Sequence, residues 1–269
     1  MSDSFLAAYS GATRVLFIVG DPIAQVKSPS GVTAQLLAAG HDAIVVPAQV
    51  APADLATWVA AMRVQKNVDG IIVTVPHKFA VVALCDELSP RSRSIGAVNV
   101  MRRTASGGWH GDMCDGEGYV VGLRHAGCEP RGLKALLVGA GGAGSAIAHA
   151  LVDAGIASLA LHEADVARRE ALAAKLRAYG PVVPTVGSAD PSGHDLVINA
   201  TPMGMKAGDP LPFDVTKLAP TQFVGDVVTV PAVPPLIAAA RERGCRTMNG
   251  TGMFEAVRDG IVDFYLETR

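Results

Sequence analysis

The chain has 269 residues, of which 49% are hydrophobic and 18% are charged, with a formal net charge of −2. This balance argues against a nucleic-acid-binding protein, and no stretch approaches the roughly 18 uninterrupted apolar residues of a membrane span. No signal peptide is evident, and the four cysteines are scattered without a CxxC pair, which argues against a disulfide framework and against a metal site. We therefore expect a cytoplasmic enzyme with a small-molecule substrate, with no metal, nucleic-acid or membrane partner, as a monomer or homodimer.

The first half of the chain alternates short apolar runs with helical patterns, which is typical of parallel α/β sheets. Strands are predicted at 14–20, 43–49 and 70–76, and helices at 28–40, at 53–65 and from 77 onward. Residues 89–112 differ, because the turn signal Ala-Ser-Gly-Gly lies between two short extended pieces. That pattern predicts a hairpin.

The second half repeats the alternation after a predicted helix at 115–127. A strand, glycine turn and helix follow at 134–155, with further strands at 158–163, 195–202 and 223–228 and helices at 235–244 and 255–269. We predict an α/β protein of two domains, an N-terminal α/β domain over 1–114 and a doubly wound domain over 115–252. The last helix, about 253–269, is expected to pack back on the first domain.

A glycine-rich turn in the second half has the spacing GxGxxG, formed by Gly139, Gly141 and Gly144 after an apolar strand and before a helix. In such a turn the first glycine permits the tight bend, the second lets backbone approach a pyrophosphate, and the third lets helix and strand pack closely. The helix start, with Gly142 and Ala143, offers N–H groups and partial positive charge to phosphates. These residues predict a dinucleotide-binding Rossmann domain.

The strand after this turn ends in His162 and Glu163, about 20 residues beyond the glycines. A carboxylate at that strand end accepts hydrogen bonds from the adenosine ribose and repels a 2′-phosphate. We therefore predict NAD as the cofactor in preference to NADP. Arg168 and Arg169 lie one turn further on and could serve NADP, but solvated helix charges are the interpretation that we favour.

Six separated motifs together resemble the shikimate dehydrogenase family, in the order found there, across nearly the whole chain. They are GDPIAQVKSP (20–29), VTVPHK (73–78), GAVNV (96–100), GDMCDGEG (111–118), GAGGAG (139–144) and NATPMGM (199–205). The resemblance implies an N-terminal domain that holds shikimate or quinate, a Rossmann domain that holds NAD(P), and an active site in the cleft between them.

Carried over by motif, the resemblance implies that Lys78 and Asp115 are the catalytic pair. Oxidation of a secondary alcohol requires a group that takes the hydroxyl proton while hydride leaves, and a lysine coupled to a carboxylate can do so. Each residue alone has a simpler explanation, a solvated lysine and a helix N-cap, and the agreement of six motifs favours catalysis. The same resemblance implies substrate ligands at Ser28, Thr74, Asn99 and Thr229, and further cofactor contacts at Asn199, Ala200, Thr201, Pro202, Val227, Gly250 and Met253.

Several positions depart from the family pattern. Val26 and Ile72 replace polar residues of the substrate site, Thr229 stands where a tyrosine is expected, and Val257 replaces a glutamine. Residues 162–164 read His-Glu-Ala in place of the Asn-Arg-Thr common in NADP users. Losing polar partners for a buried carboxylate costs about 1–3 kcal/mol each, so we expect a divergent member with weak shikimate activity or a modified substrate.

We therefore predict an NAD-dependent oxidoreductase that transfers hydride between NAD and a shikimate- or quinate-like cyclic secondary alcohol. One alternative is a catalytically weak or idle NAD-binding sensor or partner protein of the same fold. Another is an enzyme resembling methylenetetrahydrofolate dehydrogenase, which shares the layout and a lysine.

Overall fold

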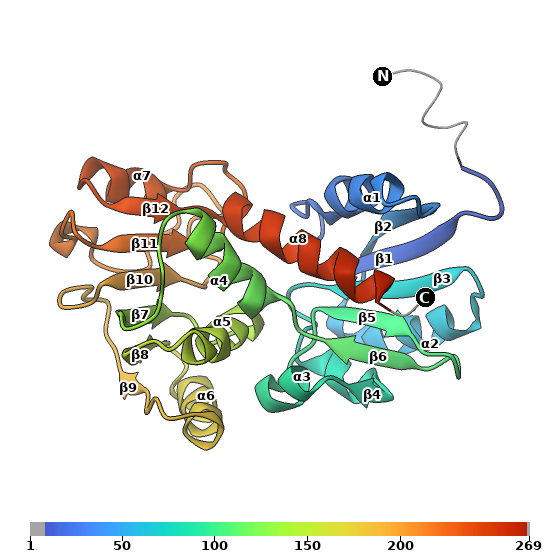
Figure 1. The fold of residues 1–269 in the computed structure, drawn as a ribbon, viewed down its shortest axis with the longest axis horizontal. Coiled ribbons are helices and arrows are strands. Elements are labelled where there is room, and N and C mark those ends of the chain that lie inside the picture. The colour runs from blue at the N-terminus through green and yellow to red at the C-terminus, as the bar shows by residue number, and fades with distance from the viewer. Residues whose placement is uncertain (1–8, 268–269) are drawn as a thin grey trace. The chain divides into compact units, whose positions relative to one another are not determined.

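The computed structural model describes residues 9–267, which fall into two compact units (Figure 1). Unit 1 comprises the chain up to Met113 together with the part from Arg258 onward, and unit 2 comprises Cys114–Val257. Residues 1–8 of the predicted first domain and residues 268–269 of the predicted last helix lie outside the described residues. No helix in the described part of the chain is long and apolar enough to cross a membrane.

Unit 1 is built on a six-stranded sheet with the order β2-β1-β3-β5-β6-β4. Strands β1 (Arg14–Gly20), β2 (Ala43–Gln49) and β3 (Val68–Val73) are parallel, while β5 (Val100–Arg103) and β6 (Trp109–Asp112) form the predicted antiparallel hairpin and β4 (Glu87–Leu88) pairs with β6. A core that includes Val19, Ile71, Val73 and Met101 lies on this sheet. The apolar runs of the sequence are therefore the buried strands.

Helices α1 (Ser28–Ala38), α2 (Leu55–Val64) and α3 (Pro90–Ile95) complete unit 1 with the second half of α8 (Gly250–Leu266). Two expectations were wrong in detail. The predicted helix from 77 is a turn followed by one short 3₁₀ segment, Ala80–Leu84, and residues 89–112 begin with α3 rather than an extended piece. Helix α3 forms because Ser89 Oγ accepts the N–H of Ser92 and Pro90 suits the first helical position.

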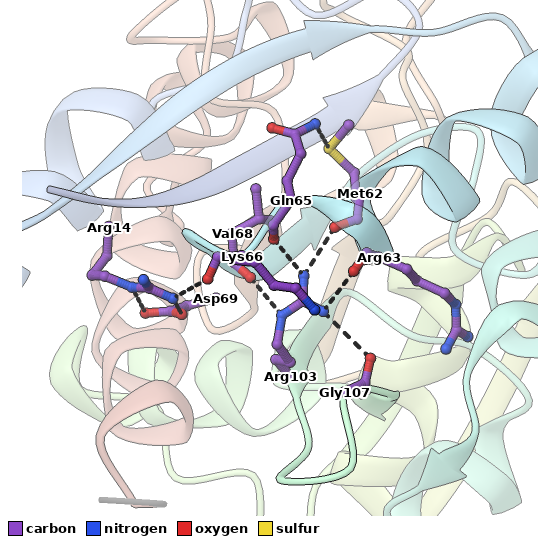
Figure 2. A network of polar contacts seen from close by, with 9 residues as sticks. All are labelled: Arg14, Met62, Arg63, Gln65, Lys66, Val68, Asp69, Arg103 and Gly107. Atoms are coloured by element: carbon purple, nitrogen blue, oxygen red, sulfur yellow. Dashed lines mark hydrogen bonds and ion pairs between the residues drawn. The ribbon is translucent and has the colours of Figure 1, made fainter. Parts of the chain in front are cut away.

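Arg103, at the end of β5, joins the hairpin to the end of α2 (Figure 2). Its guanidinium donates to five backbone carbonyls, those of Met62, Arg63, Gln65, Val68 and Gly107, over 2.8–3.3 Å. It also lies 4.6 Å above the ring of Trp109. The carbonyls at the end of α2 have no partners within that helix, and Arg103 satisfies them.

Unit 2 is a parallel six-stranded sheet with the order β12-β11-β10-β7-β8-β9. The strands are β7 (Lys134–Val138), β8 (Ser158–His162), β9 (Thr185–Val186), β10 (Leu196–Asn199), β11 (Phe223–Asp226) and β12 (Arg246–Met248), and the helices are α4 (Asp115–His125), α5 (Gly142–Asp153), α6 (Val166–Tyr179) and α7 (Pro235–Glu242). This is the doubly wound Rossmann order, whose direction reverses between β7 and β10. Ligands of such sheets bind outside the carboxyl ends of the strands at that reversal.

Candidate functional site

The turn that carries Lys78 leaves the carboxyl end of β3 in unit 1. The N–H of Thr74 donates to the carbonyl of Val19 at 2.9 Å, and that of Asp21 donates to the carbonyl of Val75 at 2.9 Å. A Cβ added to Gly20 would overlap the Thr74 side chain, so the absence of a side chain at Gly20 lets the two segments meet. The loops after β1 and β3 therefore lie together at one edge of the sheet.

Backbone hydrogen bonds bring Asn99 and Lys78 to the same edge. The carbonyl of Asn99 accepts the N–H of Val73 at 2.7 Å, and the carbonyl of Lys78 accepts the N–H of Val98 at 2.9 Å. Asn99 is buried, and Lys78 is half-buried. Thr74 and Lys78 belong to one turn, and Asn99, about twenty residues further along the chain, is thus their neighbour on the adjoining segment.

His77 anchors this turn through hydrogen bonds of its side chain and its backbone. Its side chain is buried, and its Nε2 lies 2.8 Å from the carbonyl oxygen of Val50, to which the imidazole donates. The backbone N–H of His77 donates to the carbonyl of Thr74 at 2.9 Å. Through these two bonds His77 anchors the segment that carries Lys78.

The remaining unit 1 positions lie nearby. Ser28 is the buried first residue of α1 and follows the loop 21–27, which the Asp21 bond ties to the Lys78 turn. Ile72 is buried within β3, where it lies opposite Val100. An apolar side chain therefore fills the position where the family pattern has a polar one.

The glycine turn of unit 2 has the geometry that its spacing predicts. Gly139 has φ +102°, which only glycine adopts readily, and a Cβ on Gly144 would overlap the carbonyl oxygen of Gly139. A Cβ on Gly141 would meet nothing within 4 Å, so backbone there is open to approach at the start of α5. A pyrophosphate fits this arrangement, because it needs close backbone approach and the N–H groups of a helix start.

Glu163, beyond the end of β8, is engaged within the protein. Its Oε2 accepts the N–H of Ala140 at 2.9 Å and its Oε1 accepts the N–H of Asp165 at 3.1 Å. Arg168 Nη1 lies 3.8 Å from Glu163 Oε2, and Arg168 Nη2 lies 3.6 Å from Asp165 Oδ2. The carboxylate at this strand end therefore has a cation beside it, while His162 precedes it half-buried.

Asn199, at the end of β10, is completely buried. Its amide Nδ2 donates to Asp226 Oδ1 at 3.0 Å and to the carbonyl of Met203 at 3.2 Å, and its Oδ1 accepts both the N–H and the hydroxyl of Thr201. Asn199 thus shapes the segment with Ala200, Thr201 and Pro202.

Sequence reasoning missed Asp226. The signal was present, since a carboxylate ends the strand FVGD, whose four residues are all buried. Burial raises the pKa of the Asp226 carboxyl to about 7.

The other predicted unit 2 positions follow the strand ends. Val227 and Thr229 are half-buried in the segment after β11, and Gly250 starts α8 with Met253 buried one turn later. Asp115 is the buried first residue of α4. Val257, buried, packs on Gly118 of α4, where a Cβ would clash with it.

Comparison with known proteins identifies relatives of the whole chain. The family model for the shikimate dehydrogenase substrate binding domain matches residues 18–101. A shikimate dehydrogenase (NADP(+)) from Acidiphilium cryptum is 40% identical over 246 residues, which cover 91% of this chain and 87% of the relative. Another from Rubrobacter xylanophilus is 38% identical over 89% of this chain and 86% of the relative.

Solved structures agree in fold. Quinate dehydrogenase from Corynebacterium glutamicum, in complex with NAD, is 32% identical with a TM-score of 0.83 and covers 95% of this chain and 94% of its own. Shikimate 5-dehydrogenase from Listeria monocytogenes, in complex with shikimate and NAD, is 26% identical with a TM-score of 0.85 and covers 97% of this chain and 94% of its own.

The prediction of NAD in preference to NADP was wrong, because the curated relatives are NADP(+) enzymes. The structure supplies a physical reason. The prediction assigned the Glu163 carboxylate to the adenosine ribose and treated Arg168 as a solvated helix charge. In the structure two backbone N–H groups donate to this carboxylate, and Arg168 lies beside it.

The predicted fold is confirmed, an α/β substrate-binding domain followed by a parallel-sheet Rossmann domain. The motif resemblance, the family model and relatives up to 40% identical over nine-tenths of the sequence agree. The chain belongs to the shikimate dehydrogenase family.

Proposed function

We propose that this protein transfers hydride between a shikimate- or quinate-like cyclic secondary alcohol and NADP(+). The observation that carries the proposal is the Lys78 turn. It lies within the segment that matches the substrate-binding family model, and it is fixed at the carboxyl edge of the unit 1 sheet beside Thr74 and Asn99.

The proposed chemistry divides between the cofactor and the chain. The nicotinamide, when bound, exchanges hydride with the carbon that bears the alcohol. Lys78 Nζ takes the hydroxyl proton during oxidation and returns it during reduction, with Asp115 as its proton-sharing partner. Thr74, Asn99 and Ser28 hold the ring hydroxyls and carboxylate of the substrate, and Thr229 adds a hydroxyl from unit 2. An active site formed between the two units stays a prediction.

Arg168 is the cation that we propose for the 2′-phosphate of NADP. It lies on the first turn of α6, half-exposed, and Glu163 and Asp165 hold its guanidinium from one side. Arginine suits phosphate because its planar fork donates two parallel hydrogen bonds. The dinucleotide would otherwise lie on the glycine turn 139–144 and along residues 199–202, with Val227, Gly250 and Met253 at the far side.

The apolar residues at positions 72 and 257 favour a substrate that forms fewer hydrogen bonds with the protein. Ile72 is buried in β3 and Val257 packs on α4, so neither offers a hydrogen bond to a ring hydroxyl. We therefore propose lower turnover with shikimate than with a less polar cyclic hydroxy acid.

A panel of turnover measurements tests the function. Shikimate, quinate and methylenetetrahydrofolate are each offered with NADP(+) and with NAD(+), and kcat/KM is measured. We expect turnover of a cyclic hydroxy acid with NADP(+), and Arg168→Ala to lower kcat/KM for NADP(+) by about tenfold without affecting NAD(+). Arg169→Ala is the matched control, because Arg169 pairs with Glu170 instead.

The same panel distinguishes the alternatives. Dinucleotide binding without turnover of any hydroxy acid would indicate an idle binding protein. Turnover of the folate alone would indicate methylenetetrahydrofolate dehydrogenase chemistry.

A further inference from the structure

Asp226 is a buried carboxyl group at the carboxyl end of β11, directly opposite Asn199 of β10. Its Oδ1 accepts the Asn199 amide N–H at 3.0 Å and the backbone N–H of Val228 at 3.0 Å. One oxygen atom therefore joins the segments that follow two adjacent strands, at the edge where ligands of doubly wound sheets bind.

The first connection continues through Asn199 into the loop after β10. Asn199 Oδ1 accepts the Thr201 N–H at 3.0 Å and the Thr201 hydroxyl at 2.6 Å, and Thr201 Oγ1 accepts the N–H of Met203 at 3.1 Å. Asn199 also donates to the carbonyl of Met203 at 3.2 Å. The conformation of residues 200–203 therefore depends on where the Asn199 amide is held.

The second connection continues through Val228 to the start of α8. The carbonyl of Val228 accepts the N–H of Gly250 at 3.1 Å. A Cβ on Gly250 would overlap that carbonyl, so the two backbones lie in direct contact. Asp226 thus fixes, through Val228, the position at which α8 begins.

The second carboxyl oxygen of Asp226 has a different environment. Oδ2 is buried and has no hydrogen-bond partner among residues 9–267. An ionised carboxylate with one unsolvated oxygen is costly, whereas a neutral acid at the same place loses much less. Burial accordingly raises the pKa of Asp226 to about 7.

We propose that Asp226 is a positioning residue for the dinucleotide: as a neutral acid it holds residues 199–203, Val228 and the start of α8 in the shape that binds the cofactor. It does so without contact with the cofactor, through Asn199 on one side and Val228 on the other. The inference rests on the proposed function, since it concerns segments assigned there to the dinucleotide.

Among the groups around Asp226, its own carboxyl is the one whose charge changes near pH 7. From α4 it faces the buried Tyr119, whose pKa is raised well above the ordinary value by burial and by the charge of Asp226. The charged residues of the neighbouring β12 and α7, Arg246, Arg241 and Glu242, are exposed, and Arg246 lies opposite Phe223 at the other end of the strand. As pH rises through 7, the carboxyl ionises, Oδ2 requires water, and the held segments loosen.

Binding of NADPH, measured by fluorescence titration between pH 5.5 and pH 9, tests this without turnover. Asp226→Asn keeps the shape and stays neutral, so the ratio of the wild-type Kd to the Asp226→Asn Kd isolates the ionisation of Asp226. Other titrations, including that of the cofactor phosphate, cancel in the ratio. We expect a flat ratio below pH 6 and a rise of about tenfold by pH 9, because a buried charge left without a partner is strongly penalised.

Hydrogen exchange of peptides that cover 199–205 and 227–230 gives a readout that needs no ligand. Exchange there should quicken from pH 6 to pH 9 in wild type, after correction for the intrinsic rate, and not in Asp226→Asn. Peptides of β7 should show no difference. Asp195→Asn is the matched control, because it makes the same change at the opposite end of β10, where the Asp195 carboxylate accepts the N–H of Lys134 at 2.9 Å.

The outcomes separate the two proposals. A flat ratio with unchanged exchange, in a protein that binds NADPH, overturns the role of Asp226 alone. If wild type binds no dinucleotide at any pH, the proposed function fails and this inference fails with it.

Discussion

Asn199 and Tyr119 are both completely buried in unit 2, but they differ in how far their polar atoms are hydrogen-bonded. Asn199 uses both amide atoms in four hydrogen bonds. The Tyr119 hydroxyl has no partner in the described part of the chain and lies against Gly225, where a Cβ would overlap it. A polar group of the first kind stabilises its loop, while one of the second kind adds a desolvation cost.

Removal of the Tyr119 hydroxyl should therefore cost nothing. Tyr119→Phe keeps the ring in the core, and we expect an unchanged or slightly higher melting temperature. Tyr179→Phe is the control, because the Tyr179 hydroxyl donates to Asp153 at 2.8 Å and its loss should cost about 0.5–1 kcal/mol. A loss of more than about 1 kcal/mol in Tyr119→Phe would show that the hydroxyl has a partner.

The raised pKa of Asp226 predicts how stability depends on pH. The unfolded chain ionises this carboxyl near 3.8 and the folded protein near 7, so the folded state binds the extra proton between these values. Its contribution is complete at low pH and is lost as pH rises to about 7. Relative to Asp226→Asn, wild type should lose at most about 4 kcal/mol over that range in urea unfolding. Parallel stability curves for the two proteins would contradict a raised pKa.

The strand–turn–helix unit 134–153 shows why glycine spacing is informative. Gly144 is required by packing, because β7 and α5 approach each other there, whereas Gly141 faces open space. The fold therefore requires glycine at position 144 but not at position 141, where we expect close approach of a ligand to be the reason.

Alanine at these two positions should separate folding from binding. Gly141→Ala should fold with a melting temperature near that of wild type and bind NADPH at least tenfold more weakly, since its methyl group occupies the approach to the turn. Gly144→Ala should lower the melting temperature, because its Cβ overlaps the Gly139 carbonyl. Equal NADPH affinity in Gly141→Ala and wild type would remove the pyrophosphate from this turn.

Arg103 ties the hairpin β5–β6 to the end of α2, so its loss should destabilise unit 1. Arg103→Ala leaves five carbonyls without this donor and exposes Trp109, and we expect a loss of about 2–4 kcal/mol in urea unfolding. Arg103→Lys keeps the charge but not the planar fork and should recover only part of it. A full recovery with lysine would mean that charge alone matters.

The sequence predicted correctly whether a segment is a strand or a helix where a single hydrophobic or turn pattern was present. The apolar runs at 14–20 and 134–138 and the turn at Ala-Ser-Gly-Gly are strands and a hairpin as predicted. The segment after Pro76 was misjudged because its apolar spacing suits a helix, while backbone bonds of Val98 and His77 hold it as a turn. Helix α3 was missed because its start signals, Ser89 and Pro90, also occur in loops.

In both units, motifs that act through backbone geometry could be predicted from the sequence, and contacts made by side chains could not. The glycine turn and the positions of Thr74, Lys78 and Asn99 at one sheet edge followed from strand ends and family motifs. The bond from the Ala140 N–H to Glu163 and the Asn199–Asp226 contact join residues more than 20 positions apart, so no local sequence pattern predicts them. A cytoplasmic location and a monomeric or homodimeric state stay predictions.

In the proposed function Lys78 performs the proton transfer of a dinucleotide-dependent dehydrogenase. The most direct test measures kcat for oxidation of the best cyclic hydroxy acid, and the Kd of NADPH, in Lys78→Ala and in Lys66→Ala, a change at an exposed lysine of the same unit. We predict that Lys78→Ala lowers kcat by about 10²–10⁴-fold with an unchanged Kd, and that Lys66→Ala changes neither. A Lys78→Ala protein that turns over at the wild-type rate would rule out Lys78 as the proton-transfer residue.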